Sequence, residues 1–192
     1  MNHTNKNKWD THYASCKDEL PEPAEVLLNN QYLLPDHGTA LDLACGRGAN
    51  ALLLAKHGLT VSAWDISSAA LKHLDQNANK NNLSIKSECR DVTLNPPLPN
   101  IFDIIIVSRF LERSLIPDIR AAIKSRGLIL YQTFIMDKID NNGPGNPDYL
   151  LAENELLSFF NDWKILVYRE EGGTGDIKHG FRNQAMLIAQ KP

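Results

Sequence analysis

The sequence predicts an α/β protein built around one mostly parallel sheet. Short apolar segments alternate along the chain with segments whose apolar residues recur at helical spacing, a pattern that favours strand–helix–strand units. Residues 102–107 are mostly apolar, as a strand buried on both faces requires. A turn containing Gly46 and Gly48 joins the first predicted strand to the helix that follows it.

Length and composition fit a single domain over residues 1–192 with a substantial core. The formal net charge of −3 gives no attraction to nucleic acid, and no apolar run is long enough to cross a bilayer. The polar N-terminus has no signal-peptide core, and the three cysteines lack C-x-x-C spacing. We therefore expect a cytoplasmic protein with reduced thiols, no metal site and no nucleic-acid or membrane partner.

The regular part of the chain begins near residue 39. Strands are predicted at residues 39–43, 60–64, 84–89, 102–107 and 127–134, with helices at 49–56, 67–79 and 116–123. Gly58 suits the left-handed position that ends the first of these helices. Ser67 or Ser68 can cap the second.

The two ends of the chain depart from this alternation. Residues 1–36 predict a loosely ordered flap followed by one helix, in the apolar stretch 24–34, that covers the sheet edge. Residues 137–149 contain Asn-Asn-Gly-Pro-Gly-Asn-Pro and predict an exposed loop before a helix at 153–160. The strand candidates at 164–168 and 184–189 have no helix between them, so we expect an antiparallel hairpin.

The first predicted strand carries Asp42 just before the glycine turn. Gly46, Gly48 and Ala51 satisfy the loose dinucleotide pattern G-x-G-x-x-A, so the turn alone also fits an NAD(P)-dependent oxidoreductase. Asp42 argues against that reading, because a carboxylate at this place is unfavourable for a diphosphate. It suits a ligand that carries a cationic amino group and a sulfonium, such as S-adenosylmethionine (SAM).

Two further acids follow at the ends of the next strands, Asp65 after the second and Asp91 after the third. The carboxyl ends of neighbouring parallel strands form the crevice in which such sheets bind ligands. Asp65 can accept hydrogen bonds from both hydroxyls of a ribose, and Asp91 can accept one from an adenine amino group. Each acid alone is equally consistent with a cap or turn residue, but the three together favour a SAM site.

Three segments resemble the successive cofactor motifs of class I SAM-dependent methyltransferases, namely Asp42-Leu-Ala-Cys-Gly-Arg-Gly48, Trp64-Asp65-Ile66-Ser67 and Arg90-Asp91-Val92. The resemblance implies a doubly wound, Rossmann-like sheet of about seven strands with an antiparallel last strand. It implies SAM as cofactor and S-adenosylhomocysteine as product. The residues expected to hold the cofactor are Asp42, Ala44, Cys45, Gly46, Arg47, Gly48, Asp65, Ile66, Arg90, Asp91, Val92 and Ser108.

The same resemblance implies how these residues divide the cofactor. The backbone of residues 44–48 would line its methionine part, and Asp65 would hold the ribose. Ile66 and Val92 would enclose the adenine, with Asp91 at the exocyclic amine. The chain departs from the family at Ala44, where many members have a glycine.

A finer resemblance is to the tellurite-resistance methyltransferases, which are related to thiol and thiopurine methyltransferases. It rests on Lys8-Trp-Asp10 with Tyr13, Val61-Ser-Ala-Trp-Asp65, Arg109-Phe-Leu-Glu112, and Glu153-Asn-Glu-Leu-Leu157 followed by Trp163. It implies a small, soft or anionic acceptor such as tellurite, selenite or a thiol. The chain departs from this group at Lys124-Ser-Arg-Gly127, where a Pro-Gly-Gly turn is usual.

Candidates for acceptor binding and catalysis lie in loops at the carboxyl edge of the sheet. Arg109 follows the fourth strand and can attract an anion, or it can pair with Glu112 instead. The resemblance also suggests a histidine and an arginine near the acceptor, here His179 and Arg182. The alternative for His179 is an ordinary solvent-exposed loop residue.

The N-terminal aromatic residues Trp9, His12 and Tyr13 either close the pocket or anchor their segment on the core. Cys45 is expected to pack rather than to act as a nucleophile, since no histidine is evident beside it.

Three function classes stay open at this point. The first is a small-molecule methyltransferase that uses SAM, and the second is an NAD(P)-dependent oxidoreductase. The third is a non-catalytic SAM-binding module, which would lack an acceptor cavity. The acidic balance of the chain favours a small-molecule acceptor over a macromolecule, and we expect a monomer or a homodimer.

Overall fold

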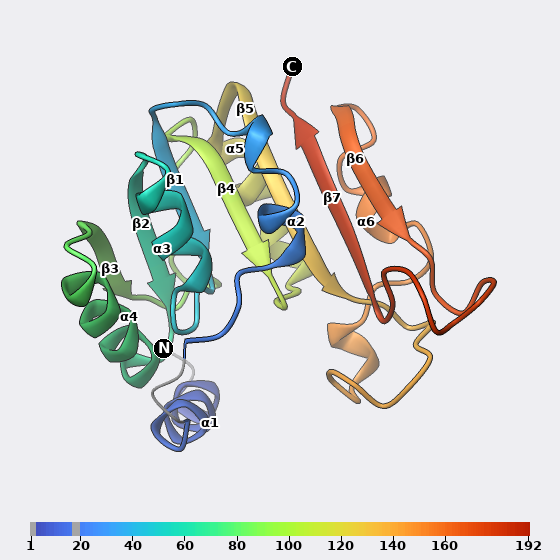
Figure 1. Cartoon of the computed structure of the whole chain (residues 1–192), viewed down its shortest axis with the longest axis horizontal. Coiled ribbons are helices and arrows are strands. Elements are labelled where there is room, and N and C mark those ends of the chain that lie inside the picture. The colour runs from blue at the N-terminus through green and yellow to red at the C-terminus, as the bar shows by residue number, and fades with distance from the viewer. Residues whose placement is uncertain (1–2, 17–19) are drawn as a thin grey trace.

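A computed structural model describes residues 3–16 and 20–192. Seven strands form one sheet in the order β3-β2-β1-β4-β5-β7-β6, which Figure 1 shows from one face. They are β1 (Thr39–Leu43), β2 (Thr60–Asp65), β3 (Ile85–Cys89), β4 (Phe102–Ser108), β5 (Ile123–Phe134), β6 (Lys164–Glu170) and β7 (Gln184–Gln190). β1 to β5 pair in parallel, and β7 is antiparallel to both β5 and β6. The predicted seven-stranded sheet with an antiparallel last strand is confirmed.

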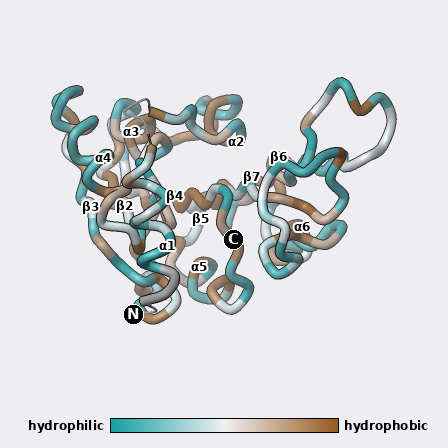
Figure 2. The backbone as a smooth tube through the Cα atoms, turned by 90° about the horizontal axis from the view of Figure 1, so that it is seen from below, coloured by the Kyte–Doolittle hydropathy of each residue, from teal (hydrophilic) through white to brown (hydrophobic). Residues whose placement is uncertain are grey.

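Helices cover both faces of this sheet, as Figure 2 shows. On one face lie α2 (Glu25–Leu28), α3 (Ala49–Lys56) and α4 (Ser68–Lys80), and on the other lie α5 (Ile116–Ala122) and α6 (Glu155–Ser158). Side chains alternate between the faces along each strand. Leu41 and Leu43 therefore pack with α5, whereas Ala40 packs with α3. This alternation directs Asp42 to the α3 face.

The local signals for α3 and α4 act as predicted. α3 ends at Lys56, and Gly58 beyond it has a φ of 105°. The hydroxyl of Ser67 accepts a hydrogen bond from the Ala70 N–H and so caps α4. Both helices begin at the carboxyl edge of the sheet, where the predicted ligand site lies.

The N-terminal segment differs from the prediction. Residues 3–14 form a regular helix, α1 (His3–Ala14), instead of a loosely ordered start, and α1 packs against α4. The apolar stretch 24–34 contains only the four-residue α2 and a 3₁₀ turn, Gln31–Leu33. α2 packs on the face of the sheet over β5 and β7, which are inner strands, and not over an edge strand. Residues 1–2 and 17–19 of the predicted flap lie outside the described residues.

Tertiary contacts explain this difference. α1 is mostly polar, so the sequence carries no apolar periodicity, and the packing against α4 stabilises the helix instead. The remaining differences are in lengths. β5 begins at Ile123 rather than at residue 127, and α6 is shorter than the predicted helix at 153–160. Residues 141–149 are exposed apart from the half-buried Pro144, and they include the 3₁₀ turn Pro147–Tyr149.

Two buried amide side chains hold the segment that leads into α2. The Asn50 Oδ1 accepts from the Ala24 N–H at 2.8 Å, and the Gln132 Oε1 accepts from the Val26 N–H at 2.8 Å. These are N–H groups at the start of a helix, which have no partner within the helix itself. Asn50 and Gln132 therefore fix α2 over the sheet by satisfying donors that would otherwise be buried and unpaired.

We predict that Gln132→Leu destabilises the protein by about 1–3 kcal/mol, because it leaves the buried Val26 N–H without a partner. Denaturant unfolding measures this change. The matched control is Gln76→Leu on the exposed face of α4, which is expected to change stability by no more than about 0.5 kcal/mol. Equal effects of the two substitutions would contradict the assigned role of Gln132.

Candidate functional site

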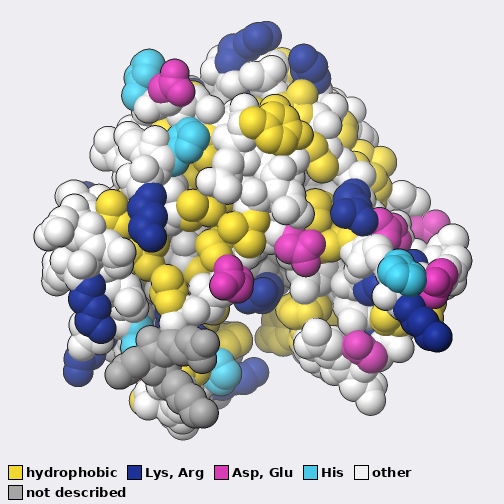
Figure 3. Space-filling view, in the orientation of Figure 1, with side chains coloured by type: hydrophobic (Ala, Val, Ile, Leu, Met, Phe, Trp, Pro, Cys, Tyr) yellow, Lys and Arg dark blue, Asp and Glu magenta, His cyan; other side chains and the backbone are white. Residues whose placement is uncertain are grey.

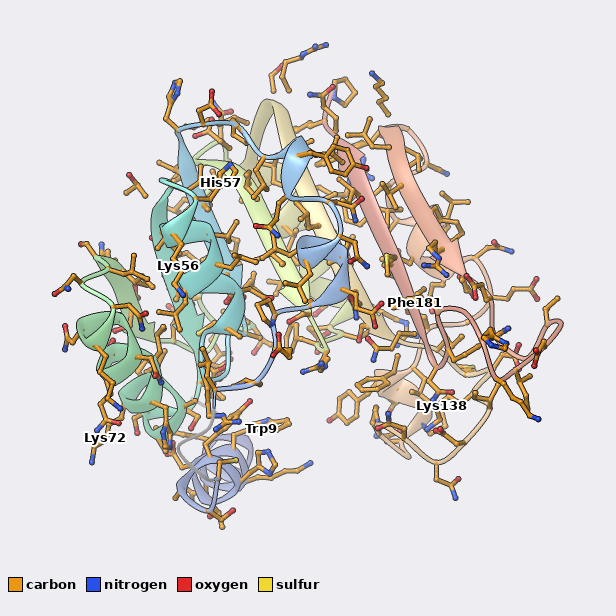
Figure 4. The ribbon with its side chains drawn as sticks, in the orientation of Figure 1. Trp9, Lys56, His57, Lys72, Lys138 and Phe181 are labelled. Atoms are coloured by element: carbon orange, nitrogen blue, oxygen red, sulfur yellow. The ribbon has the colours of Figure 1, made fainter. Side chains whose placement is uncertain are left out.

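The carboxyl ends of β1 to β6 lie at one edge of the sheet. In Figure 3 the surface is hollowed at this edge, between α1 on one side and residues 137–149 on the other. Figure 4 shows Trp9 of α1 at this edge, whereas His57, at the end of α3, lies at the opposite edge. The loops that carry the predicted cofactor and acceptor residues therefore lie along this one edge of the sheet.

The turn from β1 into α3 takes left-handed backbone three times, at Ala44 (φ 56°), Gly46 (φ 54°) and Gly48 (φ 77°). A Cβ atom at Gly48 would lie 2.3 Å from a methyl of Leu74, so glycine lets α3 start against α4. A Cβ atom at Gly46 would lie 2.7 Å from the Tyr13 hydroxyl. Ala44 takes the left-handed conformation that glycine adopts freely, at a backbone cost of about 1–2 kcal/mol.

Asp42 is fully buried beneath this turn. Its Oδ2 accepts from the Ala51 N–H at 2.9 Å, whereas its Oδ1 has no hydrogen-bond partner among the described residues. Burial raises the pKa of Asp42 to about 7, although the Ala51 N–H and the Asn50 side chain act in the opposite direction. A buried carboxyl oxygen without a partner is a place where a cationic ligand group can be accommodated.

Asp65 at the end of β2 holds the turn in place. Its Oδ2 accepts from the Gly46 N–H at 2.7 Å, and its Oδ1 accepts from the Ser67 N–H at 2.8 Å. Burial raises the pKa of Asp65, and these two N–H groups lower it in part. Each carboxylate oxygen can accept a second hydrogen bond, so contact with a ribose hydroxyl is compatible with this geometry.

A cavity of about 350 Å³ lies beyond β3 and is lined by Glu88, Cys89, Arg90, Asp91 and Asn95. Asp91 lies two residues after the strand and not at its end, and its Oδ1 accepts from the Thr93 hydroxyl at 2.7 Å. Val92 beside it is buried. This is where the sequence predicts the adenine.

The side chain of Arg90 stabilises the loop at this cavity. Its guanidinium lies 3.9 Å from the centroid of the Trp64 ring and donates to the carbonyls of Asn95 and Pro96. Its backbone N–H donates to the Asp65 carbonyl at 2.8 Å. Any contact between Arg90 and a cofactor would therefore be additional to these bonds.

The other predicted cofactor residues lie around the turn. Cys45 is buried, and burial raises the pKa of its thiol, which suits packing and not nucleophilic attack. The Ser108 hydroxyl accepts from the Asn50 amide at 3.0 Å, so the end of β4 is tied to α3. Ile66 and Arg47 are half-buried.

Two side chains of α1 contact the turns that follow β1 and β2. The Asp10 Oδ1 accepts from the Ser67 hydroxyl at 2.7 Å and from the Ala69 N–H at 3.1 Å, at the start of α4. The bonds from Lys6 and from these two donors lower the pKa of Asp10 to about 2. Tyr13 stacks on Trp9 with 5.8 Å between ring centroids, and its hydroxyl lies over Gly46. α1 thus covers the turn.

The acceptor candidates differ in how they are held. Arg109 is exposed, has a φ of 53° and donates its N–H to the Gln132 carbonyl at 2.8 Å. Its guanidinium has no hydrogen-bond or ion-pair partner within the described part of the chain. Glu112 accepts from Ser114 instead, so the alternative Arg109–Glu112 pair does not form. Arg109 is therefore available to an anion.

His179 and Arg182 lie in the loop between β6 and β7, at the same edge. The His179 side chain is 83% exposed and its Nδ1 lies 2.9 Å from Asp176. The Arg182 guanidinium donates to five backbone carbonyls of its own loop, those of Glu171, Gly172, Thr174, Asp176 and His179. Arg182 thus organises the loop, and the structure does not bring either side chain into a defined constellation with Arg109.

Sequence reasoning missed the part that Asn50, Gln132 and Asp10 play at this edge. The signals were an Asn in the first turn of a helix after a glycine turn, and a Gln within an otherwise apolar strand. Neither residue belongs to a motif, and their partners lie 26 and 106 residues away along the chain.

These features fit SAM. Asp42 offers an unpartnered, buried carboxyl oxygen, the turn takes left-handed backbone at Ala44, Gly46 and Gly48, and a cavity lies beside Asp91. In the described ranges no group of three His, Cys, Asp or Glu side chains has the arrangement of a metal site. No helix there is long and apolar enough to cross a membrane.

Comparisons with known proteins agree with this arrangement. The family model "Tellurite resistance protein TehB" matches residues 7–184. The "Probable S-adenosyl-L-methionine-dependent methyltransferase TehB" of Haemophilus influenzae is 30% identical over 139 residues, 69% of this chain and 48% of that protein. A "Ubiquinone biosynthesis O-methyltransferase" of Coxiella burnetii is 31% identical over 98 residues, 48% of this chain and 42% of that protein.

The fold has matching solved structures. The crystal structure of TehB from Haemophilus influenzae superposes with a TM-score of 0.72 at 25% identity, covering 96% of this chain and 67% of that one. The chain spans about half the length of the curated relatives that it matches. The predicted resemblance to class I SAM-dependent methyltransferases, and to the tellurite-resistance group among them, is confirmed.

We predict that Asp10→Ala loosens α1, because it removes the acceptor for Ser67 and Ala69 at the start of α4. Hydrogen bonds to a charged group contribute about 1.5–3 kcal/mol, so amide exchange in residues 3–14 is expected to rise roughly tenfold or more. Asp75→Ala, at an exposed acid of α4, serves as the control and is expected to leave this exchange unchanged. Unaltered exchange in Asp10→Ala would show that other contacts hold α1.

Proposed function

The chain belongs to the tellurite resistance protein TehB family, and we propose that it transfers a methyl group from SAM to a small, soft or anionic acceptor such as tellurite, selenite or a thiol. The observation that carries the proposal is Asp42, whose Oδ1 is buried without a partner in the described structure directly beneath the glycine turn. This carboxyl suits the cationic groups of SAM and is unfavourable for the diphosphate of NAD(P).

The cofactor would be held by the residues around the turn. The backbone of residues 44–48 would bind its methionine part above Asp42, Asp65 would accept from the ribose hydroxyls, and the cavity at Asp91 would take the adenine. When bound, SAM supplies a methyl group on a sulfonium, which is already activated for in-line displacement. The contribution of the protein is to align the acceptor and exclude water.

The acceptor side is proposed to depend on Arg109. Its strained backbone is fixed by the N–H bond to Gln132 between β4 and β5, and its guanidinium is directed to no other group of the described residues. Strain of this kind costs about 1–3 kcal/mol and is common where a side chain serves a ligand. A soft anion attracted there needs no strong base, and α1 with Tyr13 would exclude water. His179 remains a proposal for the loop side of the acceptor.

A non-catalytic SAM-binding module and an NAD(P)-dependent oxidoreductase are the competing proposals. A screen with methyl-labelled SAM against tellurite, selenite, simple thiols and thiopurines distinguishes methyl transfer from a non-catalytic SAM-binding module. We expect label to pass to at least one of these acceptors. Binding of SAM with no transfer to any acceptor would favour the non-catalytic module.

Arg109→Gln is predicted to raise the KM for an anionic acceptor roughly tenfold, the equivalent of about 1.4 kcal/mol, and to leave the Kd for SAM unchanged. The control is Arg126→Gln. Arg126 is also an exposed arginine with positive φ (67°), but it lies near the start of β5, in the irregular stretch between the paired Ile123 and Leu128, and thus at the opposite edge of the sheet. If both variants kept the KM of the unsubstituted protein, the acceptor would not depend on Arg109.

A further inference from the structure

Asp42 differs from the other acids of the site in what surrounds it. In the part of the chain that the structure describes, its Oδ1 has no hydrogen-bond partner, and its Oδ2 has the Ala51 N–H. Its neighbours in the adjacent strands are apolar, Ala63 in β2 and Ile106 in β4. The Ala51 N–H and the Asn50 side chain favour the charged form only in part, so this pocket solvates a negative charge less well than water does.

Acidic and neutral groups from the neighbouring elements act on Asp42. From β2 the carboxyl of Asp65 acts on it and raises its pKa further. From the turn comes the thiol of Cys45, which burial keeps protonated, and from α3 comes the neutral amide of Asn50. Arg47 of the same turn is half-buried and its charge acts on Tyr13, but no cation is among the groups that shift the pKa of Asp42, which lies at about 7 instead of the ordinary 3.8.

We propose that Asp42 holds a proton in the free protein and releases it to the solvent when a cationic ligand enters the turn, so that binding of SAM is coupled to loss of a proton. This inference rests on the proposed function, since it takes SAM as the ligand. The ammonium and sulfonium groups of the ligand would be the positive charges that the pocket lacks. A positive charge favours the carboxylate over the acid, and the O–H bond of Asp42 breaks without any redox change.

The coupling has a measurable consequence. Below pH 7 the protein must give up a proton to bind, so the Kd for SAM is expected to rise up to roughly tenfold for each unit of pH lost. Above pH 8 Asp42 is already ionised, and this dependence ends. The protonation state of Asp42 thus depends on whether the turn is empty or holds a cation.

The test is calorimetric titration with SAM at pH 6.5 in two buffers that differ in ionisation enthalpy. At this pH an α-amino group, with an ordinary pKa of about 7.7–8.0, is already charged, so the proton comes from the protein. We expect release of roughly three quarters of a proton per SAM bound in the unsubstituted protein. We expect none in Asp42→Asn, whose Kd should vary little between pH 6 and 8, and unchanged release in the exposed control Asp75→Asn.

SAM binding without proton release, or equal release in Asp42→Asn, would overturn the inference and leave the proposed function intact. Failure of the folded, unsubstituted protein to bind SAM at any pH would instead overturn the proposed function. The proton on Asp42 can then still be tested without a ligand.

Thermal unfolding of the free protein provides that second test. Because the folded pKa of Asp42 lies above its ordinary value, the folded state binds more protons than the unfolded state between pH 4 and 7. This contribution is present at low pH and is lost as pH rises through 7. The Tm of Asp42→Asn should therefore rise relative to the unsubstituted protein between pH 5.5 and 8.5, whereas Asp75→Asn should follow the unsubstituted curve. Parallel curves for Asp42→Asn would contradict the inference.

Discussion

The carboxylate of Asp65 connects the parts of the molecule on which the site depends. Through the N–H groups of Gly46 and Ser67 it joins the turn after β1 to the turn after β2. Both turns lead into helices that pack on the same face, α3 and α4. Loss of this carboxylate would leave two N–H groups of the turns without their acceptor, and it would remove the predicted partner of the ribose at the same time.

A few polar contacts position α1, α3 and the segment before α2 around Asp65. Asp10 of α1 accepts from Ser67 in the turn after β2, and the hydroxyl of Tyr13, on the same helix, lies over Gly46 in the turn after β1. Asn50 ties α3 to the end of β4 and to the segment before α2. Hydrogen bonds thus tie side chains of α1, α3 and the ends of β2 and β4 to their neighbours at this edge. The edge can be rigid although it consists mainly of loops.

Charge distinguishes the two halves of the depression. On the cofactor side, Asp42, Asp65 and Asp91 are all buried acids, a setting suited to a cation. On the acceptor side, Arg109 presents a positive charge that no described residue neutralises. A cationic donor and an anionic acceptor would each find the opposite charge in its own half. This division supports the proposed reaction more specifically than the fold does, since the fold alone serves many functions.

The sheet and its ligand edge could be predicted from the sequence because they depend on local signals. Apolar runs marked β1, β2 and β4, Gly58 and Ser67 marked helix ends, and the absence of a helical segment before Gln184 marked the hairpin. α1 could not be predicted, because its helix depends on contacts with α4 and not on its own apolar pattern. The bonds of Arg182 to its own loop, and those of Asn50 and Gln132 to the segment before α2, likewise depend on backbone groups that no motif identifies.

Calorimetric titration of the purified protein at pH 8 with S-adenosylhomocysteine and, in parallel, with NADH tests most directly whether the turn at Asp42 is a SAM site. We expect S-adenosylhomocysteine to bind with a Kd in the micromolar range, a binding free energy of about −8 kcal/mol, and NADH to produce no heat. A folded protein that binds NADH, or that binds neither compound, would contradict this assignment.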